Sequence, residues 1–217
     1  MSWATSHVGL ILSQTGTHLF LAIVPIVLGL IISIPLGWLA ARYRVARAIL
    51  IPLGGILYTI PSLVLLVVLP LILGTQLLDE INLIVALTIY TCALLIRSIS
   101  DALASVSDNV IAAANAIGYR SFGRFFAVEL PLAVPVMFAG LRVAMVSNIS
   151  LVSVGALVGI GGLGQLLTAG FQIYNTPEVV TAIVAIVVLA LILDGLLVVL
   201  GRTLSPWAKA ARAGATA

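Results

Sequence analysis

The sequence contains very few charged residues. Only 8% of its 217 residues are Asp, Glu, Lys or Arg, whereas a soluble domain usually carries about 25%. Hydrophobic residues make up 62% of the chain, and its mean hydropathy is +1.29. A chain with so few polar side chains cannot cover a surface that faces water. The composition therefore excludes a soluble globular protein and predicts a single integral membrane domain.

Cysteine and histidine are also almost absent. Cys92 is the only cysteine, so the chain cannot form an intrachain disulfide, and Cys92 is expected to be a small buried hydrophobic residue. His7 and His18 are expected outside the core, on the outer side, and they lack a third ligand at metal-like spacing, so no metal site is predicted. The chain also lacks a GxxxxGK[ST] phosphate loop and a GxSxG nucleophile motif. No catalytic residue is predicted.

Five apolar runs are each long enough to cross a hydrocarbon core about 30 Å thick at 1.5 Å per residue. The predicted spans are residues 17–41, 49–73, 81–99, 132–158 and 178–201. The sequence thus predicts an all-α integral membrane protein with five transmembrane helices over residues 17–203. An external N-terminal segment, residues 1–16, precedes this domain, and a cytoplasmic tail, residues 204–217, follows it.

Basic residues lie on one side of the predicted bundle. Of the ten Lys and Arg residues, nine lie at the end of span one, three or five or in the connection that follows it: Arg42, Arg44, Arg47, Arg97, Arg120, Arg124, Arg202, Lys209 and Arg212. The connections on the other side, residues 1–16, 74–80 and 159–177, contain no Lys or Arg. The positive-inside rule then predicts an N-terminus outside and a C-terminus in the cytoplasm. The sequence pI of about 9.4 is explained by this topology, in which the basic residues face anionic lipid headgroups. It therefore does not indicate nucleic-acid binding.

The connection between spans three and four, about residues 108–131, is alanine-rich. Asp108 is expected to cap a short helix that ends at Gly118 in a left-handed conformation. Ser121 is expected to cap a second helix, residues 122–129, and Pro131 to start span four. The result would be a cytoplasmic helix–turn–helix lying across the membrane surface. Its apolar side chains exceed what a solvated loop keeps, although a bland amphipathic interfacial helix is the alternative.

This loop resembles the cytoplasmic coupling motif of permease subunits of binding-protein-dependent ABC importers. The family pattern is Glu-Ala-Ala, three residues, Gly, nine residues, an aliphatic residue, one more residue, then Leu-Pro. Ala113-Ala114, Gly118, Val128 and Leu130-Pro131 match it in register. The departure is Ala112, where the family usually has Glu; it affects any contact of that carboxylate and not the shape of the loop. The resemblance covers roughly residues 17–203.

The resemblance implies that the loop sits in a groove of a cytoplasmic ATPase subunit. ATP and Mg²⁺ would bind to that subunit. This chain is therefore expected to need no cofactor and to be no enzyme. The implied coupling residues are Ala112, Ala113, Ala114, Gly118, Tyr119, Phe122, Val128, Leu130 and Pro131. Family members form two-fold dimers in the bacterial cell membrane, with the pathway along the axis. A second copy and a related permease are both open as the partner.

Two further stretches narrow the resemblance. Tyr58-Thr-Ile-Pro-Ser-Leu63 resembles a stretch of permeases that import osmoprotectants such as glycine betaine, choline and carnitine. Gly159-Ile-Gly-Gly-Leu-Gly164 is similar to a segment shared by osmoprotectant and methionine permeases. An osmoprotectant importer supplied by an external binding protein is therefore expected, with a methionine-like amino-acid importer as the alternative. A stand-alone secondary transporter would predict inverted repeats or several midplane charges, and the sequence shows no convincing repeat.

Polar, proline and glycine residues in and after the spans are candidates for the pathway. Pro61 removes a helix hydrogen bond and frees a carbonyl at membrane depth, which is tolerable only against protein or a water-lined cavity. An ordinary proline kink and interhelical hydrogen bonding are the alternatives. The expected pathway or gate residues are Tyr58, Thr59, Pro61, Ser62, Ser147, Asn148, Ser150, Ser153, Gly161, Gly162 and Gly164.

Arg142 and Asp194 are the two charges that lie at depth in the predicted spans. At 1.5 Å per residue both sit roughly 12–16 Å from the cytoplasmic face. Ionised side chains at such depth usually pair or face water. We expect an intramembrane ion pair, within the chain or across a dimer. The alternatives are that Arg142 snorkels to the interface while Asp194 faces a cavity alone, and that Asp101 is the partner of Arg142.

Overall fold

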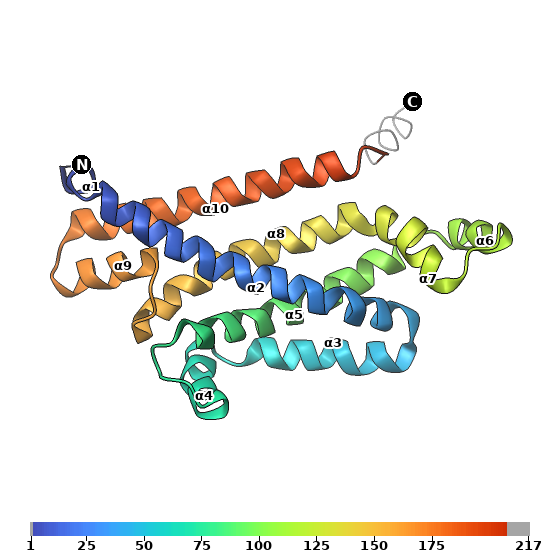
Figure 1. Ribbon diagram of the computed structural model, residues 1–217, viewed down its shortest axis with the longest axis horizontal. Helices are drawn as coiled ribbons and strands as arrows, with labels where there is room; N and C mark the ends of the chain where they lie inside the picture. Colours follow the sequence, from blue (N-terminus) through green and yellow to red (C-terminus); the bar gives the residue numbers. More distant parts are fainter. Residues whose placement is uncertain (1, 208–217) are drawn as a thin grey trace.

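The computed structural model describes residues 2–207, and all regular structure in that range is helical (Figure 1). Most of the predicted tail, including Lys209 and Arg212, lies outside the described residues. The long helices are α2 (Val8–Arg42), α3 (Arg44–Thr59), α5 (Glu80–Ala104), α8 (Leu130–Gly155) and α10 (Thr176–Leu204). The shorter helices are α1 (Ser2–Ser6), α4 (Ser62–Leu73), α6 (Asp108–Ala116), α7 (Ser121–Arg124), a π-helix (Phe125–Glu129), a 3₁₀-helix (Ala156–Val158) and α9 (Leu163–Gln172). The predicted all-α class is confirmed.

Among the described residues, four helical stretches are long and apolar enough to cross a membrane, and a fifth span exists if α3 and α4 count as one broken span. α2, α5 and α10 correspond to predicted spans one, three and five. Span four begins earlier than predicted, because the stretch 121–158 is helical throughout. Hydropathy therefore located the spans, while the helix ends extend beyond the apolar runs.

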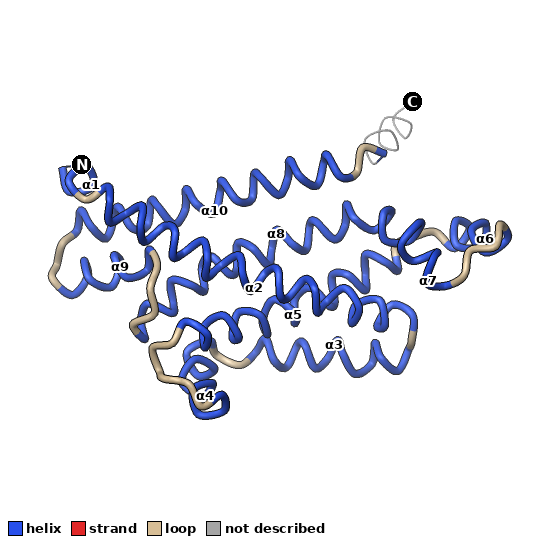
Figure 2. The backbone as a smooth tube through the Cα atoms, viewed as in Figure 1, coloured by secondary structure: helices blue, strands red, loops and turns tan. Residues whose placement is uncertain are grey.

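The second predicted span is not one continuous helix. α3 and α4 meet at Ile60 and Pro61 with a bend of 102°. Pro61 has no N–H group to continue the helix, and Ile60 is extended, with φ −66° and ψ 125°, as residues before proline usually are. Figure 2 shows α3 running alongside α5 while α4 turns away from that direction. Pro61 thus separates two helices, whereas an ordinary proline kink within one helix was one of the expectations.

α5 is the central helix of the bundle, because α2, α3, α4 and α8 all pack against it. Small residues of α2 make this approach close. A Cβ added to Gly29 would lie 2.3 Å from Cγ2 of Thr91, and one added to Gly37 would lie 2.6 Å from Cγ2 of Ile99. Two glycines eight residues apart share one helix face. Close backbone approach of this kind is how helices associate in lipid.

The N-terminal residues belong to the folded domain. Trp3 and Ile11 pack against a small apolar cluster of α9 and α10 that contains Leu163 and Leu189. His18, which was expected outside the core, is completely buried, and its Nε2 donates to the carbonyl oxygen of Ile149 at 3.0 Å. The expectation for His18 was wrong because α2 begins at Val8 and its first turns are already covered by α8 and α9.

The two ends of the bundle differ in charge. The C-terminal ends of α2, α5 and α10, the start of α3, and helices α6 and α7 lie together at one end (Figure 1). These segments, with the α6–α7 turn, carry seven of the described basic residues: Arg42, Arg44, Arg47, Arg97, Arg120, Arg124 and Arg202. α1 and α9 lie at the opposite end. The chain therefore alternates between a basic end and an end without Lys or Arg.

Two neighbouring glycines of α3 provide a test of this packing. A Cβ on Gly54 would lie 3.2 Å from the carbonyl oxygen of Ala93 in α5, whereas a Cβ on Gly55 would meet nothing within 4 Å. We expect Gly54→Leu to destabilise the protein by about 1–3 kcal/mol through overpacking, and Gly55→Leu to have little effect. Thermal unfolding in detergent measures both, and equal unfolding midpoints would contradict the packing of α3 on α5.

Candidate functional site

The alanine-rich loop forms a helical hairpin at the basic end of the bundle. α6 ends in a Schellman motif, in which Tyr119 N–H donates to the carbonyl of Ala114 at 3.1 Å and Gly118 N–H donates to the carbonyl of Asn115 at 3.0 Å. Gly118 has φ +96°, the left-handed conformation expected from the sequence. The N-cap of α6 is Ser107, with Asp108 in the first turn, which corrects the predicted start by one residue.

The second half of the hairpin differs from the prediction. Ser121 begins α7 without capping it, and the predicted separate helix, residues 122–129, runs through the π-helix directly into α8. Leu130 N–H donates to the carbonyl of Phe125, five residues earlier. The wider turn has a physical cause, because Pro131 would clash with the carbonyl four residues before it in a regular α-helix. The second half of the hairpin is therefore continuous with span four.

A buried polar network joins the two halves of the hairpin. Arg124 and Glu129 are 8% and 9% exposed and form an ion pair through Arg124 Nε and Glu129 Oε1. Arg124 Nη1 also donates to Oδ1 of Asn115 in α6 at 2.7 Å. Sequence reasoning did not select these residues, because a spacing of five brings side chains together only in a π-helix. The network links α6 to the helix that leads into span four.

The tip of the hairpin exposes apolar side chains. Ile117 is 77% exposed, Phe122 is 73% exposed, and the rings of Phe122 and Phe126 pack edge to face with centroids 4.9 Å apart. Among the other implied coupling residues, Ala112, Ala113, Gly118 and Tyr119 are exposed, Ala114 is buried, and Val128, Leu130 and Pro131 are partly buried. The implied coupling residues thus include both exposed and buried positions of the hairpin.

Asn148, placed on the pathway by the sequence, is 1% exposed. Its Nδ2 donates to Oγ1 of Thr91 at 3.0 Å and to the carbonyl of Ala22 at 3.5 Å, so it links α8 to α5 and α2. Asn148 is thus an interhelical hydrogen-bonding residue, the alternative that the sequence left open.

The three serines of this set lie in different surroundings on α8. Ser150 is exposed and donates to the carbonyl of Val146 in its own helix at 3.1 Å. Ser147 is partly buried. Ser153 Oγ is buried and has no hydrogen-bond partner among the described residues. The structure therefore does not gather the four polar residues of span four on one face.

The α3–α4 break brings together the residues of the Tyr58–Leu63 stretch. Tyr58 is 41% exposed, Thr59 and Pro61 are exposed, and Ser62 is partly buried. Tyr90 of α5, which the sequence did not single out, donates from its hydroxyl to the carbonyl of Ile60 at 2.6 Å. No spacing rule links Tyr90 to a residue thirty positions earlier. A tertiary side-chain contact thus satisfies one of the freed carbonyls.

The glycine-rich segment forms a tight turn at the end opposite the hairpin. Gly162 has φ +97°, and its N–H donates to Oε1 of Gln14 at 3.0 Å. A Cβ on Gly164 would lie 2.8 Å from Cα of Ser153, so α9 packs closely on the end of α8. Gly161 is only partly buried, and a Cβ added to it would lie 3.1 Å from Cγ2 of Thr17. The segment is a packed turn joining α8 to α9.

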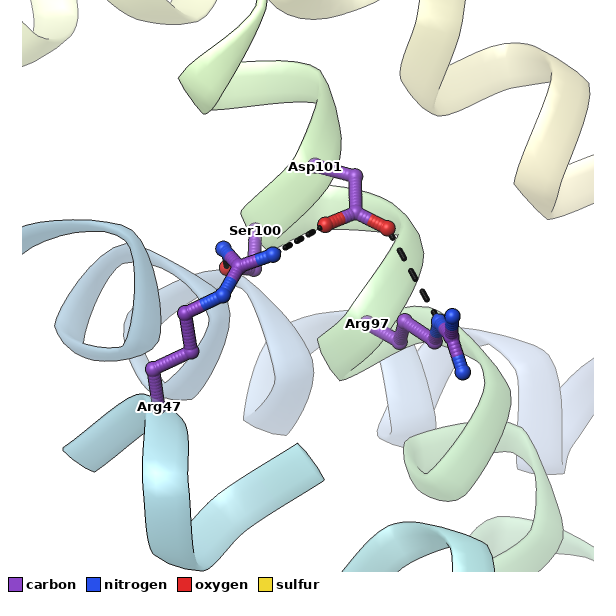
Figure 3. A network of polar contacts seen from close by, with 4 residues as sticks. All are labelled: Arg47, Arg97, Ser100 and Asp101. Atoms are coloured by element: carbon purple, nitrogen blue, oxygen red, sulfur yellow. Dashed lines mark hydrogen bonds and ion pairs between the residues drawn. The ribbon is translucent and has the colours of Figure 1, made fainter. Parts of the chain in front are cut away.

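Arg142 and Asp194 form a bidentate ion pair within the chain. Arg142 Nε and Nη2 each donate to one oxygen of Asp194 at 2.6 Å, and the side chains are 42% and 26% exposed. The pair links α8 to α10. The rival partner, Asp101, lies elsewhere: it accepts from Arg47 Nη2 at 2.7 Å and lies 3.8 Å from Arg97 Nε. Figure 3 shows Asp101 between these two arginines, with Arg47 also donating to Ser100.

Comparisons with known proteins agree with this architecture. The model of a family described as "Binding-protein-dependent transport system inner membrane component" matches residues 33–206. The glycine betaine/carnitine/choline transport system permease protein OpuCB of Bacillus subtilis is 29% identical over 206 residues, which cover 95% of this chain and 94% of the relative. The osmoprotectant import permease protein OsmW of Salmonella typhimurium is 32% identical, with coverage of 92% and 94%.

A solved structure shares the fold. A chain of the MetNI methionine ABC transporter, in an inward-facing conformation, superimposes with a TM-score of 0.80 at 24% sequence identity. The match covers 92% of this chain and 98% of that chain. Two proteins this similar in structure have the same helical topology.

The Arg142–Asp194 pair can be tested by charge exchange. We expect Asp194→Asn and Arg142→Gln each to lower thermal stability in detergent, because each leaves one charge without its partner within the membrane. The swap Arg142→Asp with Asp194→Arg should recover part of the loss. Asp101→Asn is the control, and its effect should be smaller because Asp101 lies in the last turn of α5, at the basic end of the bundle, where water can solvate the arginines left without it. A swap no better than the sum of the single variants would contradict the pairing.

Proposed function

Because this chain belongs to the family of binding-protein-dependent transport system inner membrane components, we propose that it carries osmoprotectants across the cell membrane. It is a permease subunit of an ABC importer and has no ATPase site of its own. The observation that carries the substrate proposal is the near full-length similarity to permeases named for glycine betaine, carnitine and choline. The Tyr58–Leu63 stretch lies at the α3–α4 break, where a pathway residue is expected.

We infer that the hairpin, α6 to the π-helix, binds a cytoplasmic ATPase subunit that holds ATP and Mg²⁺. Its exposed apolar tip, with Ile117 and Phe122, suits a groove in a protein better than water. α6 packs on α7 and the π-helix, so its position is set within the hairpin. Because the π-helix continues into α8, a movement of the hairpin would be transmitted along the helix to span four.

We also infer that two permease subunits form the pathway between them, as a pair of this chain or with a related permease. Large apolar side chains remain exposed on α4 and α10, such as Leu71 at 83% and Leu191 at 67%. Lipid and a second subunit are the two environments that suit such faces. An external binding protein would deliver the substrate at the end that holds α9.

An amino-acid importer is the second candidate. The observation that favours it is the fold shared with a methionine ABC transporter. The 29–32% identity to osmoprotectant permeases, against 24% to that transporter chain, favours the first proposal. The two candidates differ in chemistry, because methionine carries a primary ammonium group and the osmoprotectants carry a quaternary one.

Uptake into proteoliposomes tests the function. With its co-purified ATPase and its binding protein, the wild-type permease should import radiolabelled glycine betaine, choline or carnitine in an ATP-dependent way, and should not import methionine. Gly118→Val should abolish uptake while ATP hydrolysis continues, because valine is strained at φ +96° and would re-orient the hairpin.

The matched control is Gly123→Val in the same hairpin, where an added Cβ makes only an ordinary contact 3.8 Å from Tyr119 Cδ1. It should retain most uptake. Normal uptake by Gly118→Val at wild-type expression would count against the coupling role, and uptake of methionine alone would replace the first candidate by the second.

Cysteine labelling tests the proposed orientation, with the N-terminus outside. In a Cys92→Ala background, Val45→Cys should react with a membrane-impermeant reagent only from the cytoplasmic side, and Tyr174→Cys only from outside. Both native side chains are exposed, at 72% and 92%. Labelling from the reversed sides would contradict the orientation and the assignment of the hairpin to a cytoplasmic ATPase.

A further inference from the structure

The break between α3 and α4 leaves main-chain carbonyl groups open at membrane depth. In a continuous helix the carbonyl oxygens of Tyr58 and Thr59 would accept from N–H groups four residues later. Here α3 ends at Thr59, and among residues 2–207 no hydrogen bond to either oxygen is formed. The next carbonyl, of Ile60, is satisfied by the hydroxyl of Tyr90 at 2.6 Å. Two acceptors therefore remain side by side.

The depth of the break decides what can lie against it. α3 begins at Arg44 at the basic end, and Tyr58 lies about 21 Å further along the helix at 1.5 Å per residue. This places the open carbonyls well inside a hydrocarbon core about 30 Å thick. Unsatisfied backbone groups are not tolerated against lipid, and they persist only where they face protein or a water-filled cavity. The break is therefore expected on the pathway side of the subunit.

One of the two residues with an open carbonyl, Tyr58, also carries an aromatic ring. The ring of Tyr58 is 41% exposed and packs edge to face with Tyr90, with centroids 5.5 Å apart and planes at 74°. Tyr90 is itself buried, at 3% exposure, and its hydroxyl is fixed by the bond to Ile60. The orientation of the Tyr58 ring is thus held by a buried neighbour while part of the ring stays accessible.

These groups suit one class of cation. Neither α3 nor α4 contains an acidic residue, so the break offers partial negative charge from a ring face and two carbonyl oxygens without a carboxylate. A quaternary ammonium group has no N–H to donate, and it interacts well with aromatic faces. Its methyl groups carry the positive charge and can contact carbonyl oxygens through weak C–H···O bonds.

We propose that Tyr58 and the open carbonyls of Tyr58 and Thr59 form a transient binding site for the quaternary ammonium group of the transported compound. Tyr90 is the positioning residue that holds both the ring and the break. The site rests on the proposed osmoprotectant function, because it requires a substrate with this group. It gives the permease a selectivity step of its own, in addition to the external binding protein.

A graded change at position 58 tests the site in the reconstituted importer. Tyr58→Phe keeps the ring and is the reference against which the fluorinated variants are compared for uptake of glycine betaine. Phenylalanines carrying one, two and three fluorine atoms at position 58 should lower uptake stepwise, because fluorine withdraws the charge that attracts the cation. Tyr58→Leu should reduce uptake by about 3- to 30-fold, the range of a cation–π contact, while the ATPase remains stimulated by the loaded binding protein.

The matched control is Tyr43→Leu, since Tyr43 is 53% exposed and lies at the basic end between α2 and α3. It should leave uptake unchanged. A flat response to fluorination, or wild-type uptake by Tyr58→Leu, would overturn the site and leave the proposed function intact. A wild-type importer that moves methionine and no quaternary ammonium compound would overturn the proposed function, and the site with it.

Accessibility provides a second, independent measurement. In the Cys92→Ala background, Thr59→Cys of the purified dimer should react rapidly with a hydrophilic thiol reagent, because water reaches the open carbonyls. Val67→Cys of α4, where the native side chain is 51% exposed, reports on the labelling of an apolar helix face. A Thr59→Cys variant that reacts no faster than Val67→Cys would place the break against lipid or protein and overturn the proposal.

Discussion

The hydrogen bonding of main-chain groups constrains where this helical membrane protein can depart from a regular α-helix. An unpaired N–H or C=O group cannot be left facing lipid, so every break needs a partner from elsewhere in the fold. The hydroxyl of Tyr90 reaches the carbonyl of Ile60, and the side chain of Gln14 accepts from the N–H of Gly162. Ahead of Pro131 the chain instead widens into a π-helix and keeps its own hydrogen bonds. At the α3–α4 break no hydrogen bond to the carbonyl oxygens of Tyr58 and Thr59 is formed among residues 2–207, and this is the break for which we propose a function.

Packing between the helices follows from the same environment. Lipid removes most of the hydrophobic drive for helix association, so close backbone contact and polar links must supply specificity. Gly29 and Gly37 bring α2 onto α5, and Asn148 joins α8 to both of these helices. Few side chains of α10 are buried, although it packs against α8 and α9. The Arg142–Asp194 pair is therefore a specific link that fixes the rotation of α10 against α8.

The sequence predicted the features that depend on local chemistry. Hydropathy located the spans, and the run of helix-forming residues ending in glycine identified Gly118 as a left-handed helix end. Features that depend on helix rotation were not predictable, because helices that are apolar on all sides give no signal of which face is inside. The burial of His18 and Asn148 is of this kind. Proline marks a disturbance without its angle, so the 102° bend also needed the structure.

The hairpin shows how α6, the proposed coupling helix, is held although Ala112 stands where the resembling family usually has Glu. Ala112 is exposed on α6 and carries no polar group, so the links to span four come from the other half of the hairpin. Arg124 supplies them by binding Asn115 of α6 and Glu129 of the π-helix at once. A buried ion pair of this kind has little flexibility, because separating it would leave two charges uncompensated. The proposed force from the ATPase would therefore have a continuous helical route to α8, which carries both Asn148 and Arg142. Movement of α8 would then act on α2 and α5 through Asn148 and on α10 through Arg142.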